Sequence, residues 1–143
     1  MDDERADWDE RRRQAVAGHA AAFEAGRAAE AAEAADLLAG FVREATERGL
    51  TPTVLRATSF DGHATYKTRL KGWYLKKNRS IAVGTDGGYY VLTVPSSLRA
   101  RFAGAEIHPS VPRLVVGAGG GDGETLPLAQ LLRRRLDAGV TWP

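Results

Sequence analysis

The sequence predicts one α+β domain with a long N-terminal helical region, an antiparallel meander of four to five strands, and a C-terminal helix on the same face of the sheet. Three observations favour this fold class. Residues 4–48 are rich in Ala, Glu and Arg and contain no Pro, which favours a helix. From Thr53 onward apolar and polar residues alternate, which is typical of strands. Leucines at helical spacing return between residues 128 and 136.

The second half of the N-terminal region has a clear core-facing stripe. Its apolar residues follow the i, i+3, i+4, i+7 pattern of a helix that packs on one side: Ala34, Leu37, Leu38, Phe41, Val42 and Ala45. Gly49 stands where a left-handed residue commonly ends a helix, and Pro52 follows it. These signals predict that the helix ends near Arg48.

The first half has a thinner stripe, which consists of Trp8, Val16, Ala20 and Phe23. A straight helix over residues 4–48 would be ~65 Å long, whereas a compact domain of this size has a radius of gyration of about 15 Å. We therefore expect the helix to break near Gly18 or Gly26, or to fray. The alternative is a projecting arm that needs a partner. Residues 1–25 are accordingly predicted to be an acidic helical arm or a frayed helix start, and residues 26–143 the single α+β domain.

Turn signals set the predicted registers of the strands. Strands are expected over residues 53–59, 64–77, 80–85 and 88–94. Asp86-Gly87 is a pair favoured in two-residue hairpin turns, and we take Asn78-Arg79 as a second such turn. Trp73 then lies opposite Gly84, and Gly84 opposite Tyr89. The core-facing side would carry Leu70, Tyr74, Ile81, Val83, Tyr90, Leu92 and Val94.

The remaining segment is predicted to hold three more elements. Ser96 or Ser97 caps a short helix that reaches residue 102, residues 111–116 form a strand, and a closing helix begins with Thr125 as its N-cap. The glycine-rich run over residues 117–124 lies between strand and helix, as a dinucleotide-binding loop would. Its spacing does not fit, because Asp122 or Glu124 stands where the third glycine is required. We expect a surface loop there.

The lysines give the main functional signal. All four lie between residues 67 and 77, where basic and bulky residues alternate. With the registers above, one face of the sheet carries a basic-aromatic set that we predict to be the binding site: Lys67, Arg69, Lys71, Trp73, Lys77 and Tyr89. We expect this face to hold an acidic protein partner. The alternatives are single-stranded nucleic acid stacked on the aromatic rings, and a face that is merely solvated or is covered at Trp73 by a helix or the N-terminal arm.

Charge and composition limit the other classes of function. Residues 1–50 carry 12 acidic and 7 basic residues, a net charge of −5, whereas residues 51–143 carry 6 and 13, a net charge of +7. The acidic helix of one copy is therefore expected to shield the basic body or to pair with a second copy as a homodimer. No run of apolar residues resembles a secretory signal or a membrane span, so we expect a cytoplasmic location.

The sequence predicts no catalytic residue, no metal site and no cofactor. The chain has no Cys, which excludes disulfides and thiol chemistry. The enzyme alternative is a small metal-free hydrolase or nuclease in which His63 and His108 act as acid and base beside a lysine such as Lys67. That alternative requires the two histidines to meet in one cleft.

Overall fold

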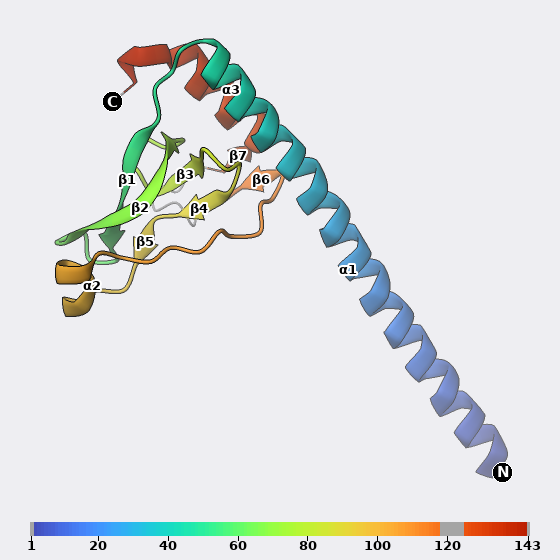
Figure 1. The fold of residues 1–143 in the computed structure, drawn as a ribbon. Helices are drawn as coiled ribbons and strands as arrows, with labels where there is room; N and C mark the ends of the chain where they lie inside the picture. Colours follow the sequence, from blue (N-terminus) through green and yellow to red (C-terminus); the bar gives the residue numbers. More distant parts are fainter. Residues whose placement is uncertain (1, 118–124, 143) are drawn as a thin grey trace.

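The computed structural model describes residues 2–117 and 125–142 and shows a mixed α/β body from which one end of a long helix projects (Figure 1). The C-terminal part of α1 (Asp2–Glu47) packs on the sheet together with α3 (Leu128–Ala138). The shorter helices are α2 (Leu98–Ala103) and the 3-10 turn η2 (Gly139–Thr141). Among the residues that the structure describes, no helix has both the length and the apolar character needed to cross a membrane.

Five strands form the main sheet in the order β4-β3-β2-β1-β5. They are β1 (Thr53–Ser59), β2 (Thr65–Tyr74), β3 (Ile81–Gly84), β4 (Tyr89–Val91) and β5 (Thr93–Val94). The first four form an antiparallel meander, and β5 returns to the far edge, where it pairs parallel with β1. Two further strands, β6 (Val115–Val116) and β7 (Leu126–Pro127), pair antiparallel. The predicted α+β class is confirmed, with β5 as the exception to the meander.

Two hairpins of the meander close through three-residue loops, one residue longer than predicted. Residues 77–79 connect β2 to β3, and residues 85–87 connect β3 to β4, as shown by the pairings Tyr74 with Ala82 and Val83 with Tyr89. The third loop residue has a left-handed backbone in both loops, with φ of 60° at Arg79 and 81° at Gly87. This loop type is the regular alternative to a two-residue turn. The predicted registers are therefore wrong by one residue.

The register places Trp73 in the core and not on an open face. Trp73 lies opposite Val83 and is only 2% exposed. Its ring meets Phe41 edge-on at 5.8 Å between centroids, and its Nε1 donates a hydrogen bond to the Leu50 carbonyl over 3.0 Å. The predicted exposure of Trp73 is wrong because α1 and α3 cover this end of the sheet. Their buried side chains in this core are Ala34, Leu38, Phe41, Ala45, Leu128, Leu131, Leu132 and Leu136.

The opposite face of the sheet carries a smaller apolar cluster. Tyr74, Ala82 and Tyr90 alternate with the Trp73 row and pack with Leu55 and Leu92. The predicted core face mixed residues of the two faces, since Ile81 and Val83 belong with Trp73. Gly84 does not leave room between aromatic rings: it lies opposite Gly72, and a Cβ on it would approach the Tyr90 ring to 2.9 Å.

Helix α1 continues without interruption through Gly18 and Gly26, so the expected break is wrong. Residues 2–29, hereafter the arm, project from the body (Figure 1). The arm is held by its own helical propensity and by local ion pairs such as Arg11 with Asp7 at 2.9 Å. Each glycine costs about 1 kcal/mol relative to Ala in a helix, which is too little to force a kink.

The C-terminal segment agrees with its predicted leucine stripe but not with its predicted start. Leu128, Leu131, Leu132 and Leu136 are all buried. Pro127, not Thr125, precedes α3, because residues 126 and 127 pair with β6 as β7. The strand predicted over residues 111–116 is limited to Val115–Val116. Residues 118–124 of the glycine-rich run lie outside the described residues.

Candidate interaction groove

The first half of β2 has an edge that none of the described strands covers. β3 pairs with the last three residues of β2, from Gly72 to Tyr74, so residues 65–70 extend beyond it. The β1–β2 register also shifts along this stretch, because Lys71 lies opposite Val54 whereas Lys67 lies opposite Arg56. Two extra residues of β2 therefore oppose β1, and the strand is irregular around Arg69.

The Thr68 side chain provides hydrogen bonds to the backbone at this irregular stretch. Its hydroxyl donates a hydrogen bond to the Leu55 carbonyl over 2.5 Å and accepts one from the Leu70 N–H over 3.2 Å. Thr68 is buried, and its neighbours Lys67 and Arg69 are exposed. A polar side chain thus replaces the missing ladder bonds, as expected for a bulged strand, and the two basic side chains remain in solvent.

The segment that follows β5 covers the open edge. The Ser97 N–H donates to the Tyr66 hydroxyl over 3.0 Å, and the Ala105 N–H donates to the Lys67 carbonyl over 2.8 Å. Between them, Gly104 ends α2 with φ of 84°, and a Cβ there would lie 2.9 Å from the Lys67 carbonyl oxygen. Only glycine satisfies both the left-handed backbone and the close approach. α2 is thus fixed beside β2 at both of its ends.

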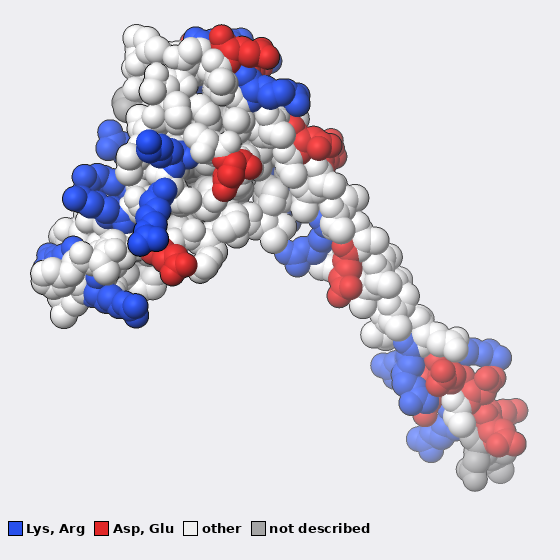
Figure 2. Space-filling view, in the orientation of Figure 1, with Lys and Arg blue, Asp and Glu red and all other residues white. Residues whose placement is uncertain are grey.

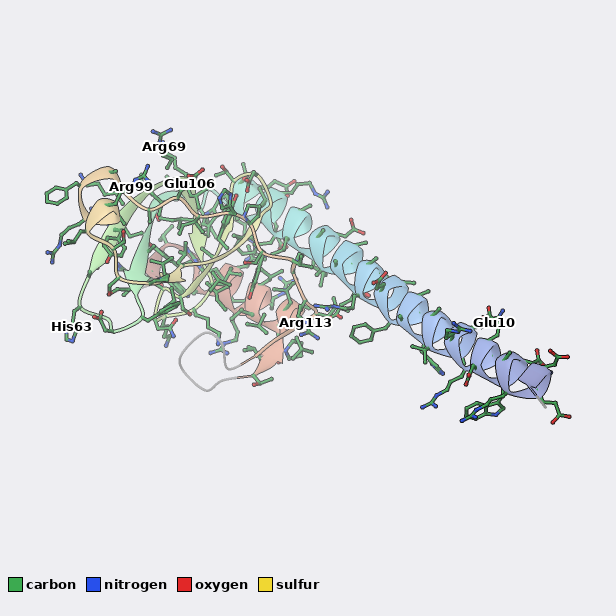
Figure 3. The ribbon with its side chains drawn as sticks, turned by 90° about the horizontal axis from the view of Figure 1, so that it is seen from below. Glu10, His63, Arg69, Arg99, Glu106 and Arg113 are labelled. Carbon is green, nitrogen blue, oxygen red and sulfur yellow. The ribbon has the colours of Figure 1, made fainter. Side chains whose placement is uncertain are left out.

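A groove of about 850 Å³ lies between β2, β5 and α2. Its charged lining consists of Lys67, Arg69, Arg99 and Glu106, three cations and one carboxylate. Within residues 2–117 and 125–142, none of the three cations forms an ion pair. Figure 3 shows Arg69, Arg99 and Glu106 on one side of the body, and Figure 2 shows basic side chains gathered over the part of the body remote from the arm. We call this site the basic groove.

The uncharged lining of the basic groove is polar at Thr68 and Ser97 and apolar at six other positions, which we call its floor. The floor consists of Val94, Pro95, Ala100, Ala103, Ala105 and Ile107. Beside it, α2 exposes two large apolar side chains, Leu98 at 74% and Phe102 at 88%. They are four residues apart and share one side of the short helix. An apolar floor with a basic rim suits a chain that carries both apolar and acidic side chains.

The structure separates the six residues predicted as a binding face. Lys67 and Arg69 line the basic groove. Lys71 and Lys77 are exposed outside that lining, Lys77 in the loop between β2 and β3. Trp73 is in the core. Tyr89 is half-buried against the same core, and burial raises the pKa of its phenol.

The two histidines of the enzyme alternative lie in different parts of the body. His63 follows β1 in a turn where its N–H donates to the Asp61 carboxylate over 3.0 Å. The Ser59 hydroxyl and this N–H lower the pKa of Asp61. His108 lies between Ala105, whose N–H donates to the Lys67 carbonyl, and Ser110, which bridges to Tyr89 of β4. Neither histidine lines the basic groove. No group of side chains in the described residues is suited to hold a metal ion.

Sequence reasoning missed Arg99 and Glu106 as site residues. The predicted short helix is confirmed, with Ser97 as its N-cap accepting from the Ala100 N–H over 3.1 Å. Its position against β2 depends on contacts from Tyr66 and Gly104, which join segments about 30 residues apart in sequence. No periodicity signals such contacts. The sequence offers one local clue, which is Gly104 itself. A glycine directly after a short capped helix favours a sharp change of direction.

No family model, no curated protein and no solved structure matches this chain.

Proposed function

We propose that the chain is a non-catalytic protein-interaction module, an adaptor whose basic groove holds an acidic segment of a partner protein. The observation that carries this proposal is the trio Lys67, Arg69 and Arg99, unpaired among the described residues and placed around an apolar floor. Exposed ion pairs contribute only about 0.2–1 kcal/mol each. The floor therefore supplies most of the affinity, and the cations select the partner and speed its association.

The partner segment that fits best is an amphipathic acidic helix. Addition of a strand to the edge of β2 is blocked at Lys67, because its carbonyl already accepts the Ala105 N–H. A partner therefore contacts the groove through side chains. Acidic residues on one side of a helix would face Arg69 and Arg99, and its apolar residues would cover the floor and the exposed Leu98.

Single-stranded nucleic acid is the less favoured ligand. Stacking of bases requires exposed aromatic rings, but of the two rings predicted for it Trp73 is 2% exposed and Tyr89 packs on the core, and Phe102 beside the groove offers a single ring. The hydrolase alternative is disfavoured as well, because neither histidine lines the basic groove. The test below separates the nucleic-acid alternative from the proposed function by ligand.

The test is a titration of isotope-labelled protein, followed by NMR, with two separate probes: a synthetic amphipathic Glu-rich helix and an oligothymidylate. We expect the peptide to shift amide signals of residues 66–69 and 97–107. Arg69→Glu and Arg99→Glu should each weaken its binding about tenfold or more, equal to about 1.4 kcal/mol. Lys77→Glu is the matched control, with the same change of charge outside the groove, and should have little effect.

Two results would contradict the proposed function. One is equal weakening by Lys77→Glu, which would mean that the peptide senses only net charge. The other is tight binding of the oligothymidylate with no response to the peptide, which would assign the groove to nucleic acid.

A further inference from the structure

The arm carries an apolar stripe that no described residue covers. Val16 and Phe23 are 64% and 66% exposed. With Ala20 they stand 18 residues before Ala34, Leu38 and Phe41, the stripe that the body buries. Eighteen residues are five turns of a helix at about 3.6 residues per turn. The two stripes therefore lie on the same side of α1, and the exposed one belongs to the part of the helix that projects beyond the body (Figure 1).

The stripe continues into charged residues at the spacing of a coiled coil. Steps of four and three residues lead along one seam: Asp9, Arg13, Val16, Ala20, Phe23 and Arg27. The Arg27 guanidinium already lies over the Phe23 ring, 5.6 Å from its centroid. The seam is thus apolar in its middle, acidic near the tip and basic near the body.

We propose that a second copy of this chain pairs with the arm, the two arms running antiparallel. In the register where Val16 of one copy meets Ala20 of the other, Asp9 meets Arg27 and Arg13 meets Phe23. Two-fold symmetry repeats each contact. Asp9, Arg13 and Arg27 then each face an opposite charge or an aromatic ring. A parallel pair would place Asp9 on Asp9, Arg13 on Arg13 and Arg27 on Arg27, which is repulsive at all three positions.

The exposed length of the arm fits this register. In this register the numbers of two opposed residues always sum to 36. Asp2 of one copy therefore lies opposite Ala34 of the other, and the two helices run side by side between these positions. Ala34 is the first residue of α1 that its own body buries completely. A shift of one heptad would instead run the arm against the partner's body beyond Ala34, opposite Phe41. Glu30, the seam residue before Ala34, pairs at 3.7 Å with Arg113 of its own body, which Figure 3 shows at the base of the arm, so Glu30 needs no partner in the second copy.

The pair is expected to be reversible. Each seam contributes only two large apolar side chains, Val16 and Phe23, and the rest is Ala or charged. The ion pairs between Asp9 and Arg27 set the orientation more than the affinity. The interaction is independent of the basic groove, so its failure would leave the proposed function untouched.

A charge swap in the full chain tests the proposal, with sedimentation over a concentration series as the measurement. Asp9→Arg and Arg27→Asp should each weaken dimer formation about tenfold or more, whereas the double variant should restore it. Asp3→Arg is the matched control, because it makes the same charge change outside the seam. All of these positions are exposed, and circular dichroism of each variant checks that it keeps the fold.

Crosslinking reports the orientation directly, since the chain has no Cys of its own. A mixture of Asp9→Cys and Arg27→Cys proteins should form a disulfide between the two variants faster than either variant does with itself. Three results would overturn the proposal: a monomer at every concentration, a dimer that both single charge variants leave unchanged, or preferential linkage of Asp9→Cys to itself, the signature of parallel arms.

Discussion

The two halves of α1 carry nearly the same apolar pattern, but the stripe of one half is buried and that of the other is exposed. In the half that packs on the body, Ala34, Leu38 and Phe41 are at most 2% exposed, whereas Val16 and Phe23 on the arm are 64% and 66% exposed. The helix itself does not differ, since α1 is continuous. Periodicity therefore identifies the apolar side of a helix. The rest of the chain determines whether that side is buried in its own core or is left exposed for another molecule.

Their charged residues differ in the same way. In the body half, Glu44 pairs with Arg48 at 2.7 Å and lies 3.6 Å from Arg133 of α3, so its charge joins two helices. On the arm, Asp7 and Glu10 pair only with Arg11 and Arg13 of the same helix. The body half is thus held by tertiary contacts, and the arm by local ones that stabilise a helix by a few tenths of a kcal/mol each.

The largest expected effect comes from shortening one large apolar side chain in each of the two stripes to Ala. Leu38→Ala should lower the free energy of unfolding by about 2–5 kcal/mol, because it leaves a cavity between α1, β3 and α3. Phe23→Ala removes more atoms but should cost less than about 0.5 kcal/mol in the monomer, because the Phe23 ring contacts the Arg27 guanidinium of its own helix and does not belong to the described core. Urea denaturation at low protein concentration measures both. A Phe23→Ala loss as large as that of Leu38→Ala would show that the arm belongs to the core.

A tryptophan pair sharpens the comparison. Trp73→Phe should cost about 1–3 kcal/mol, because it leaves the buried Leu50 carbonyl without the indole donor at 3.0 Å. Trp8→Phe makes the same change at a residue that is 60% exposed and should leave the unfolding midpoint unchanged. A stable Trp73→Phe variant would contradict the core position of that ring.

Glycine substitutions should have opposite signs in the two regions. Gly26 lies in the interior of the helix, and a Cβ added there would meet no atom within 4 Å. Gly26→Ala should therefore stabilise the arm by about 0.5–1 kcal/mol, seen as higher helicity by circular dichroism. Gly104→Ala places a Cβ 2.9 Å from the Lys67 carbonyl oxygen at φ of 84°. It should destabilise the body by about 1 kcal/mol or more and shift the NMR signals of α2. Unchanged signals there would contradict the anchoring of the basic groove.

The smallest expected effect is confined to the body and to alkaline pH. Burial, and the hydrogen bond that the Tyr90 hydroxyl donates to Asp86 over 2.7 Å, raise the pKa of Tyr90 from 10.0 to about 12. A phenol whose pKa is higher in the folded state contributes stability that is complete below its unfolded pKa and disappears as the pH rises through its folded pKa. Wild type should therefore lose more stability than Tyr90→Phe between pH 10 and about 12. Equal losses would show that Tyr90 titrates as an exposed phenol.

Most of the fold follows from sequence, whereas the site does not. The end of α1, the strand β1 and the leucine stripe of α3 rest on local signals, namely Gly49, alternation and helical spacing. The predicted registers of the two hairpins are wrong because each loop has a third residue in the left-handed conformation, Arg79 in one and Gly87 in the other. Arg79 has no turn preference that would signal its position. One extra loop residue in each hairpin moved Trp73 from a predicted open face into the core. The basic groove depends on contacts between distant segments, which alternation along one strand does not contain.

Hydrogen exchange along α1 tests the contrast between its two halves most directly. At low protein concentration we predict that amides from Ala34 to Ala45 exchange only through global unfolding, while those of residues 4–28 exchange rapidly. At high concentration the arm amides should gain protection in wild type and not in Asp9→Arg, while the body amides stay unchanged. Strong protection of the arm at every concentration, or no gain on concentrating the wild type, would contradict the proposal that the arm stripe packs on a second copy.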